Sequence, residues 1–235
     1  MESEVDGRYD IEGFAFIGRT FDEYRRMFDL DVDALDGRRV LDCPGGSCSF
    51  AAEAAARGVD AVAVDPLYAA DVESLVARGR DDVERAASAL SEVERLYRWT
   101  FYDDPDDVAD YRRAALERFR LDACANPGRY VAARLPSLPF ADDSFSLVLS
   151  AHLLFLYDDR LDAAFHRAAL SELLRVARDE LRVFPLSGFD ATRSARLDDA
   201  LETLEANGYD ATVEDVPFEF QRDANELLRI RAEQH

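Results

Sequence analysis

A glycine-rich turn between a strand and a helix is the feature that most constrains how this chain folds. The apolar run 39–42 leads directly into a turn that contains Gly45 and Gly46, and 50–57 then has the composition of a helix. The apolar stretch 59–66 has the pattern of a second strand. A strand, a glycine turn, a helix and a strand in this order form a βαβ unit, and the two strands of such a unit are parallel. The sequence therefore predicts a sheet that is largely parallel.

The remainder of the chain continues the alternation of helices and strands. Thr20 and Glu23 have the capping-box spacing of a helix N-terminus. We expect helices at 20–28, 70–97, 106–121, 161–177 and 197–208, and strands at 129–132, 146–150, 181–185, 210–216 and 226–232. This pattern predicts a single α/β domain over 1–235: a doubly wound, mostly parallel, seven-stranded Rossmann-like sheet with an antiparallel last strand. We expect residues 1–36 to form an N-terminal helical lid and residues 70–121 a helical insertion.

The charge of the chain excludes several classes of partner. The 235 residues contain 28 Arg and no Lys against 49 Asp and Glu, which gives a formal net charge of −21. A surface this negative repels phosphate backbones, so we expect no nucleic-acid partner. No apolar run approaches the roughly 20 residues that span a bilayer. We therefore expect a cytoplasmic protein with a small-molecule substrate and no membrane partner, whose oligomeric state the sequence leaves open.

The acidic, Lys-free composition resembles that of proteins from halophiles that accumulate salt. Self-repulsion at this net charge destabilises a compact state, and molar salt screens it. An ordinary acidic mesophile protein is the alternative. Cys43, Cys48 and Cys124 are an odd number of cysteines at spacings that do not fit a zinc knuckle. We expect three packed, inert thiols and no metal site.

The glycine turn and an acid further along the chain predict a nucleoside ligand. Gly45 and Gly46 can adopt positive φ and let a ligand approach the backbone closely, and the N-terminus of the following helix supplies N–H groups. Asp65 lies 23 positions after Asp42 at the end of the second strand. An acid at this distance accepts hydrogen bonds from ribose hydroxyls. The alternative is that Asp42 ends a strand without a ligand and Asp65 is solvated.

The sequence resembles the class I S-adenosylmethionine-dependent methyltransferases over nearly its whole length. The residues that carry this resemblance are Val40-Leu41-Asp42 with the glycine turn, Asp65, and the stretch 138–149, which reads LPFADDSFSLVL. More particular stretches are 18–24, 65–68, 135–140, 150–157, 182–186 and 218–222, which are similar to a prokaryotic, haloarchaeal-like subfamily. The resemblance implies S-adenosyl-L-methionine as the cofactor and methyl transfer to an unidentified, small acceptor as the activity.

The resemblance also implies the residues that contact the cofactor. Arg19 and Tyr24 close over its carboxylate, and its methionine end is surrounded by Asp42, Pro44, Gly45, Gly46 and Ser47. Its ribose lies at Asp65 and Pro66, and its adenine lies at Leu135. Ser150 is a further contact. The chain departs from the family pattern at Pro44 and Cys48, which stand at glycine positions, and at Arg134, which stands where many relatives carry an acid. Since Arg cannot accept a hydrogen bond, we expect backbone groups at Leu135 to hold the adenine. Arg19 in a surface ion pair is the alternative role.

For the acceptor side of the site, His152 is the candidate catalytic residue. It follows the fourth expected strand and titrates near neutral pH, as a base for a nitrogen or oxygen nucleophile does. A structural, hydrogen-bonded histidine is the alternative. Candidate substrate residues are Trp99, Tyr157, Gln221, Arg222 and Asn225, although Trp99 and its aromatic neighbours also fit the core of the insertion.

Two other functions fit parts of the sequence. The altered glycine turn and Arg134 fit a non-catalytic module that binds S-adenosylmethionine or a nucleotide. The segment Gly45-Gly46-Ser47-Cys48-Ser49 half resembles the nucleophile elbow of serine hydrolases, with Ser47 as the nucleophile, but Ser49 replaces the last glycine. That reading leaves Asp65 unexplained.

Overall fold

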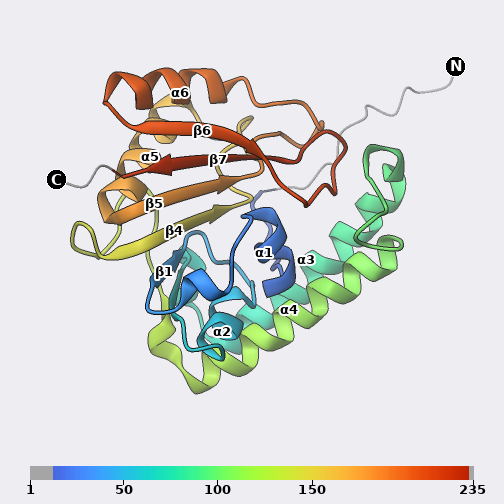
Figure 1. Ribbon diagram of the computed structural model, residues 1–235. Helices are drawn as coiled ribbons and strands as arrows, with labels where there is room; N and C mark the ends of the chain where they lie inside the picture. Colours follow the sequence, from blue (N-terminus) through green and yellow to red (C-terminus); the bar gives the residue numbers. More distant parts are fainter. Residues whose placement is uncertain (1–12, 233–235) are drawn as a thin grey trace, which may run out of the picture.

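The computed structural model describes residues 13–232 and contains a seven-stranded sheet in the order β3-β2-β1-β4-β5-β7-β6 (Figure 1). The strands are β1 (Arg39–Asp42), β2 (Asp60–Val64), β3 (Tyr130–Val131), β4 (Phe145–Ala151), β5 (Ala177–Phe184), β6 (Asp210–Asp215) and β7 (Glu226–Arg231). β7 is antiparallel to both β5 and β6, and the other paired strands are parallel. The predicted doubly wound sheet with an antiparallel last strand is confirmed.

Helices cover both faces of this sheet. Strand residues alternate between two apolar clusters, as the two-residue period of a strand requires: Val40 belongs to one cluster and Leu41 to the other. The first cluster includes α1 (Phe21–Met27) and α2 (Phe50–Ala55), and the second includes α5 (Ala163–Val176) and α6 (Arg196–Ala206). α1 begins at the predicted capping box of Thr20 and Glu23.

The expected helical insertion is a hairpin of two long helices, α3 (Val72–Glu92) and α4 (Pro105–Ala125). They lie side by side and extend past the edge of the sheet (Figure 1). Gly79 permits close packing, because a Cβ there would lie 2.7 Å from Leu116 Cδ1. The far end of the hairpin, the hairpin tip (residues 93–104), contains the 3-10 turn η3 (Glu94–Leu96).

Several sequence expectations need correction. The first helix of the insertion ends at Glu92 rather than at residue 97, so Trp99 lies in the tip. β5 begins at Ala177, directly after α5, because Ala177 pairs with Phe145. Cys43 and Cys48 are buried, but Cys124 is exposed on α4, so the expectation of three packed thiols is wrong. Residues 1–12 of the expected lid lie outside the described residues.

Within residues 13–232, no helix is long and apolar enough to cross a membrane. The same part of the chain contains no group of three or more His, Cys, Asp or Glu side chains arranged to hold a metal ion.

Candidate functional site

The glycine turn lies at the carboxyl edge of the sheet, between β1 and α2. Gly46 has a φ of +49°, and a Cβ on Gly45 would lie 2.6 Å from Tyr68 Oη and 2.8 Å from Ala63 Cβ. The backbone N–H of Gly45 donates to Val64 O (2.8 Å). Of the two glycines, Gly46 therefore supplies the left-handed backbone conformation, and Gly45 supplies a close approach to β2.

An N-terminal strap (residues 14–20) lies across this turn. At Gly18, a Cβ would stand 2.0 Å from the carbonyl oxygen of Ser47, so only glycine fits there. Ser49 N donates to Arg19 O (3.0 Å), and Ser47 Oγ donates to Phe16 O (3.3 Å). The strap thus covers the turn, and Ser47 is fully buried beneath it.

Asp65 connects the turn to the end of β2. Its Oδ2 accepts from Gly46 N (3.1 Å) and its Oδ1 accepts from Leu67 N (2.8 Å). Burial raises the pKa of Asp65, and these two hydrogen bonds act in the opposite direction. Because each carboxylate oxygen has a second lone pair, Asp65 shapes the turn and still has acceptor capacity for a ligand.

Behind the turn lies a buried acid, Asp42, at the end of β1. Tyr24 Oη donates to Asp42 Oδ1 (2.8 Å), while Asp42 Oδ2 has no hydrogen-bond partner among the described residues. Burial raises the pKa of Asp42 to about 8; the Tyr24 hydrogen bond opposes this, and the charge of Asp65 adds to it. In the described part of the chain, Ser150 Oγ at the end of neighbouring β4 is also buried without a partner. The two unsatisfied polar atoms lie at the carboxyl ends of neighbouring strands but on opposite faces of the sheet, because Asp42 shares the face of Val40 and Ser150 shares the face of Val148. In doubly wound folds, ligands bind near this edge.

A cavity extends from the glycine turn to the helices of the insertion. Its volume is about 170 Å³, and its wall combines the strap, the turn, Asp65, α3, α4, the ends of β4 and β5, and the loop between β6 and β7. The wall near the insertion is mostly apolar, with Val83, Ala87 and Leu90 from α3 facing Phe184 and Phe218. The cavity thus has a polar end at the turn and an apolar end at the insertion.

Two arginines on the cavity wall share one buried glutamate. Arg112 forms an ion pair with Glu23 Oε1, and Arg112 Nη2 donates to Tyr102 Oη (3.0 Å). Arg19 Nε lies 3.6 Å from the same glutamate oxygen. Glu23 is fully buried; burial by itself would raise its pKa, but Arg112 and Arg19 outweigh that effect and lower it. The carboxylate is therefore ionised between two guanidinium groups.

His152 follows β4 directly and lies on the cavity wall. Its φ is +53°, a left-handed conformation that is uncommon for a residue with a side chain and is frequent at functional sites. Its backbone N–H donates to Phe184 O (2.7 Å), which holds it in place. Burial lowers the pKa of His152 well below its usual range, and the charges of Arg19 and Arg112 lower it further. The imidazole is therefore neutral at pH 7 and can accept a hydrogen bond, while its surroundings oppose its protonation.

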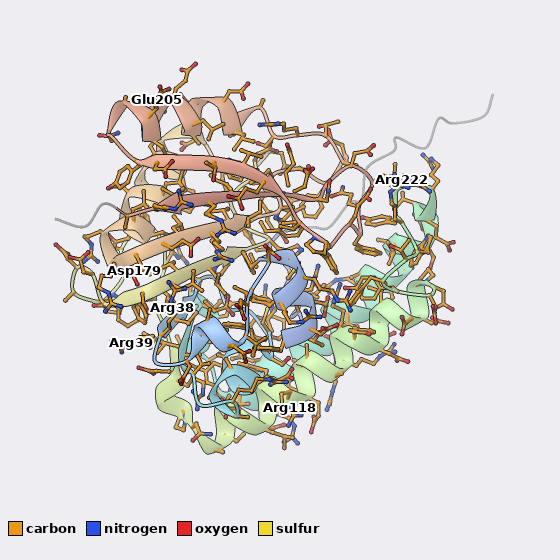
Figure 2. All side chains as sticks on the ribbon, viewed as in Figure 1. Arg38, Arg39, Arg118, Asp179, Glu205 and Arg222 are labelled. Carbon is orange, nitrogen blue, oxygen red and sulfur yellow. The ribbon has the colours of Figure 1, made fainter. Side chains whose placement is uncertain are left out.

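The structure brings together about half of the residues expected from the sequence. Those on the cavity wall are Arg19, Pro44, Gly45, Gly46, Asp65, His152, Tyr157 and Gln221. Those that lie behind or away from the wall are Tyr24, Asp42, Ser47, Pro66, Leu135, Ser150, Trp99, Arg222 and Asn225. Trp99 donates through Nε1 to Glu94 O (3.3 Å), and Arg222 lies at the outer end of the hairpin (Figure 2), where its Nε donates to Arg95 O.

Sequence reasoning missed the wall that the insertion supplies, above all Arg112. A signal for it exists: Arg112 lies four residues after Val108 and four before Leu116, both buried, so it occupies the apolar face of α4. A charged residue on an apolar helix face needs a buried partner, which here is Glu23. The sequence does not indicate which residue that partner is.

The strand order, the glycine turn and Asp65 define this chain as a doubly wound α/β protein with a ligand cavity at the carboxyl edge of its sheet. This is the fold that the resemblance to class I methyltransferases implies. No family model matches the chain. It is 30% identical over 223 residues to the "Uncharacterized protein MJ0045" of Methanocaldococcus jannaschii, covering 94% of this chain and 98% of that protein. The chain therefore belongs to the same family as MJ0045.

Among solved structures, this chain is similar in fold to three proteins of low sequence identity. The 1,6-didemethyltoxoflavin-N1-methyltransferase of Burkholderia thailandensis is 15% identical, with 89% of this chain and 78% of that one covered and a TM-score of 0.48. The PH0226 protein of Pyrococcus horikoshii is 11% identical, with 90% of each chain covered and a TM-score of 0.47. The magnesium protoporphyrin IX methyltransferase of Synechocystis PCC 6803, solved with bound SAM, is 12% identical, with 91% of each covered and a TM-score of 0.42.

Proposed function

We propose that this protein transfers a methyl group from S-adenosyl-L-methionine to a small molecule bound in the cavity. The observation that carries the proposal is the placement of Asp65 and the glycine turn at one end of a single cavity that also contains His152. The ribose would lie at Asp65, and the amino-acid tail would lie at Gly45 and Gly46.

The residues at this end fit such a cofactor in two further respects. Gly46 lies on the cavity wall at a φ of +49°, where a Cβ would have only Ile17 O within 4 Å, at 3.4 Å, and Asp42 Oδ2, behind the wall, lacks a partner in the described chain. A cofactor with an ammonium group and hydroxyls offers donors to unsatisfied acceptors of this kind. The contacts of Arg19, Tyr24, Pro44, Ser47, Pro66 and Leu135 with the cofactor remain predictions of the sequence resemblance.

The chemistry asks little of the protein beyond positioning. The sulfonium supplies an activated methyl group, so the protein has to hold the two reactants in line and exclude water. The neutral imidazole of His152 can accept a hydrogen bond from an oxygen or nitrogen nucleophile and orient it, whereas burial, Arg19 and Arg112 oppose its protonation. The acceptor atom is not part of the proposal. We also propose that Tyr157 and Gln221 contact the acceptor, and that the protein acts in a salt-rich cytoplasm.

The strap has to move when the cofactor enters. A dry apolar protein cavity of about 150 Å³ holds a single benzene ring, and the cavity here is about 170 Å³. A nucleoside with an amino-acid tail exceeds that volume. We therefore propose that residues 14–20, a part of the lid expected over residues 1–36, open for the cofactor and close over it.

Calorimetric titration with S-adenosylhomocysteine, S-adenosylmethionine and NAD in molar KCl tests the cofactor assignment. We expect the first two to bind and NAD not to bind. Asp65→Asn should weaken S-adenosylhomocysteine binding by about 10- to 100-fold, since hydrogen bonds to a charged acceptor contribute about 1.5–3 kcal/mol. Asp71→Asn is the matched control, because Asp71 is an exposed helix cap away from the cavity. Equal losses in both variants would refute the ribose assignment.

Two alternatives remain distinguishable from this proposal. A non-catalytic module would bind S-adenosylmethionine but would not pass its labelled methyl group to any compound in a low-molecular-mass cell fraction. A serine hydrolase would react at Ser47 with a fluorophosphonate probe. Ser47 is fully buried and donates to Phe16 O, and it has no hydrogen bond to a histidine among the described residues, so we expect no labelling.

A further inference from the structure

The two arginines on the cavity wall carry one more charge than their shared partner balances. Arg19 and Arg112 are each cationic, and Glu23 supplies one carboxylate between them. The Arg19 side chain is 17% exposed and that of Arg112 is 4% exposed. A surplus positive charge in so largely buried a site is costly unless something compensates it. In a chain with a net charge of −21, acids are abundant, yet no other described acidic side chain forms an ion pair with either arginine.

The surplus charge resides on Arg19. Both oxygens of Glu23 are already occupied: Oε1 accepts from Tyr102 and Arg112, and Oε2 accepts from Thr20 N (2.7 Å) and Thr20 Oγ1 (2.9 Å). Arg19 approaches Oε1 only to 3.6 Å, which is beyond hydrogen-bond distance. Among the described residues, the acceptor of its guanidinium is Gly18 O (3.3 Å). A guanidinium has five N–H donors, so Arg19 retains donors for a ligand.

The other polar groups of the wall do not remove this charge. Asp65 lies at the turn end, where Arg78 rather than Arg19 or Arg112 acts on it. His152 is close enough to both arginines to be affected by their charges, and it is neutral. S-adenosylmethionine adds no net negative charge: its carboxylate and ammonium group cancel, and its sulfonium adds one positive charge.

Next to the arginines, the cavity is apolar. Ala86 and Ala87 of α3, Ala109 of α4, and the rings of Phe184, Phe218 and Phe220 form its wall. These surfaces favour a ligand with an apolar body. A ligand with a single negative charge would balance the one surplus positive charge. The planar guanidinium group can form two parallel hydrogen bonds with a carboxylate.

We propose that the methyl acceptor is a small apolar molecule with one carboxylate, which binds Arg19 while its apolar body packs between α3 and the phenylalanines. The identification of this molecule as the methyl acceptor rests on the proposed function. The carboxylate site at Arg19 does not depend on that function. Arg19 is thereby assigned to the acceptor rather than to the carboxylate of the cofactor.

Benzoate and benzamide are suitable probes, because they have nearly the same shape and differ in charge. We measure their affinities calorimetrically for the protein alone and for the protein saturated with S-adenosylhomocysteine. We expect benzoate to bind about tenfold more tightly than benzamide in both states, as a charge-assisted hydrogen bond predicts. Arg19→Gln should remove this preference, Arg19→Lys should retain most of it, and Arg25→Gln, an exposed pair with Asp22, should not change it.

Three outcomes would overturn the proposal. The first is equal affinity for benzoate and benzamide in the wild-type protein, a measurement that does not depend on any variant folding. The second is displacement of benzoate by S-adenosylhomocysteine. The third is an Arg19→Gln variant that loses S-adenosylhomocysteine but keeps the benzoate preference, which would assign Arg19 to the cofactor. If benzoate binds with the expected preference and S-adenosylhomocysteine does not bind at all, the carboxylate site stands and the proposed methyl transfer fails.

Discussion

The two ends of the cavity are built in different ways. At the turn end, backbone groups of the turn, the strap and Asp65 hold one another by hydrogen bonds. Close contact with the Ser47 backbone requires glycine at Gly18, and close contact with Tyr68 Oη and Ala63 Cβ requires glycine at Gly45. At the insertion end, side chains from α3, α4 and the loop between β6 and β7 form the wall, and one buried ion pair joins α4 to α1. Backbone therefore fixes the shape of the first end, and side-chain identity sets the chemistry of the second.

The largest effect that tests this contrast is expected at Gly18. In Gly18→Ala, the new Cβ would lie 2.0 Å from Ser47 O. The atoms that it meets belong to the backbone of Ser47 and Cys48, so no rotamer change relieves the clash. We expect a loss of about 3 kcal/mol of unfolding free energy, the upper range for overpacking. We also expect faster amide exchange over residues 14–20. Chemical denaturation and hydrogen exchange measure the two effects.

Gly128→Ala is the matched control for this substitution. Its φ lies outside the left-handed region, and a Cβ there would have no heavy atom within 4 Å. We expect its unfolding free energy to stay within about 0.5 kcal/mol of the wild type. Equal losses in the two variants would mean that the strap does not depend on close backbone contact at the turn.

The same contrast explains what the sequence could predict. The turn end is local: the capping box of Thr20 and Glu23, the glycines and the acid after β2 are all recognisable from spacing, and the structure contains the capping box and the turn. The alternation of strands and helices likewise predicts the doubly wound, mostly parallel sheet, because a βαβ unit leaves few topologies. Errors at the ends of elements, as at β5, arose where pairing with a distant strand extends a segment beyond its own propensity.

The insertion end depends on contacts that no local pattern contains. Arg112 meets Glu23 across 89 positions of sequence, and Tyr97 pairs with Gln221 from another part of the chain. The sequence left two roles open for Trp99, substrate contact or the core of the insertion; Trp99 packs against Tyr97 and Phe220 outside the cavity wall, whereas Tyr97 lies on that wall. Residue type alone does not decide whether an aromatic side chain lines the cavity or packs outside it, since both positions use the same apolar surface.

A smaller effect is expected at Asp42, where the turn end contains an acid without a counter-charge. Its pKa of about 8 in the folded protein is far above the value of about 3.9 in an unfolded chain. The folded protein therefore keeps a proton that the unfolded chain releases. This contribution to stability is fully present below about pH 4 and is lost progressively as the pH rises to about pH 8.

Asp42→Asn resembles the protonated acid and should remove this pH dependence. Between about pH 6.5 and about pH 8, the wild type should lose about 2 kcal/mol of unfolding free energy relative to the variant. Denaturation curves of both proteins at several pH values measure the difference. Parallel pH profiles would show that Asp42 is ionised in the folded protein, with an unseen partner for its second oxygen.

The smallest effect is expected at the hairpin tip, which closes the insertion end. Arg98 forms an ion pair with Glu219, its backbone N–H donates to Phe220 O (2.7 Å), and Arg222 N donates to Leu96 O (2.9 Å). The tip is thus attached to the loop that supplies Phe220 and Gln221 to the cavity wall. Because the Arg98 side chain is 42% exposed, Arg98→Gln should cost at most about 1 kcal/mol of unfolding free energy.

The informative readout for Arg98→Gln is local opening rather than global stability. If the insertion end is held by side chains, amide exchange should accelerate at residues 94–99 and 217–225 while the strap at residues 14–20 is unchanged. Arg120→Gln, which breaks an exposed pair with Glu117 within α4, is the control and should leave both segments unchanged. Faster exchange in the strap of Arg98→Gln would mean that the two ends open as one unit, since the buried pair of Arg112 and Glu23 would then transmit the change from the hairpin to α1.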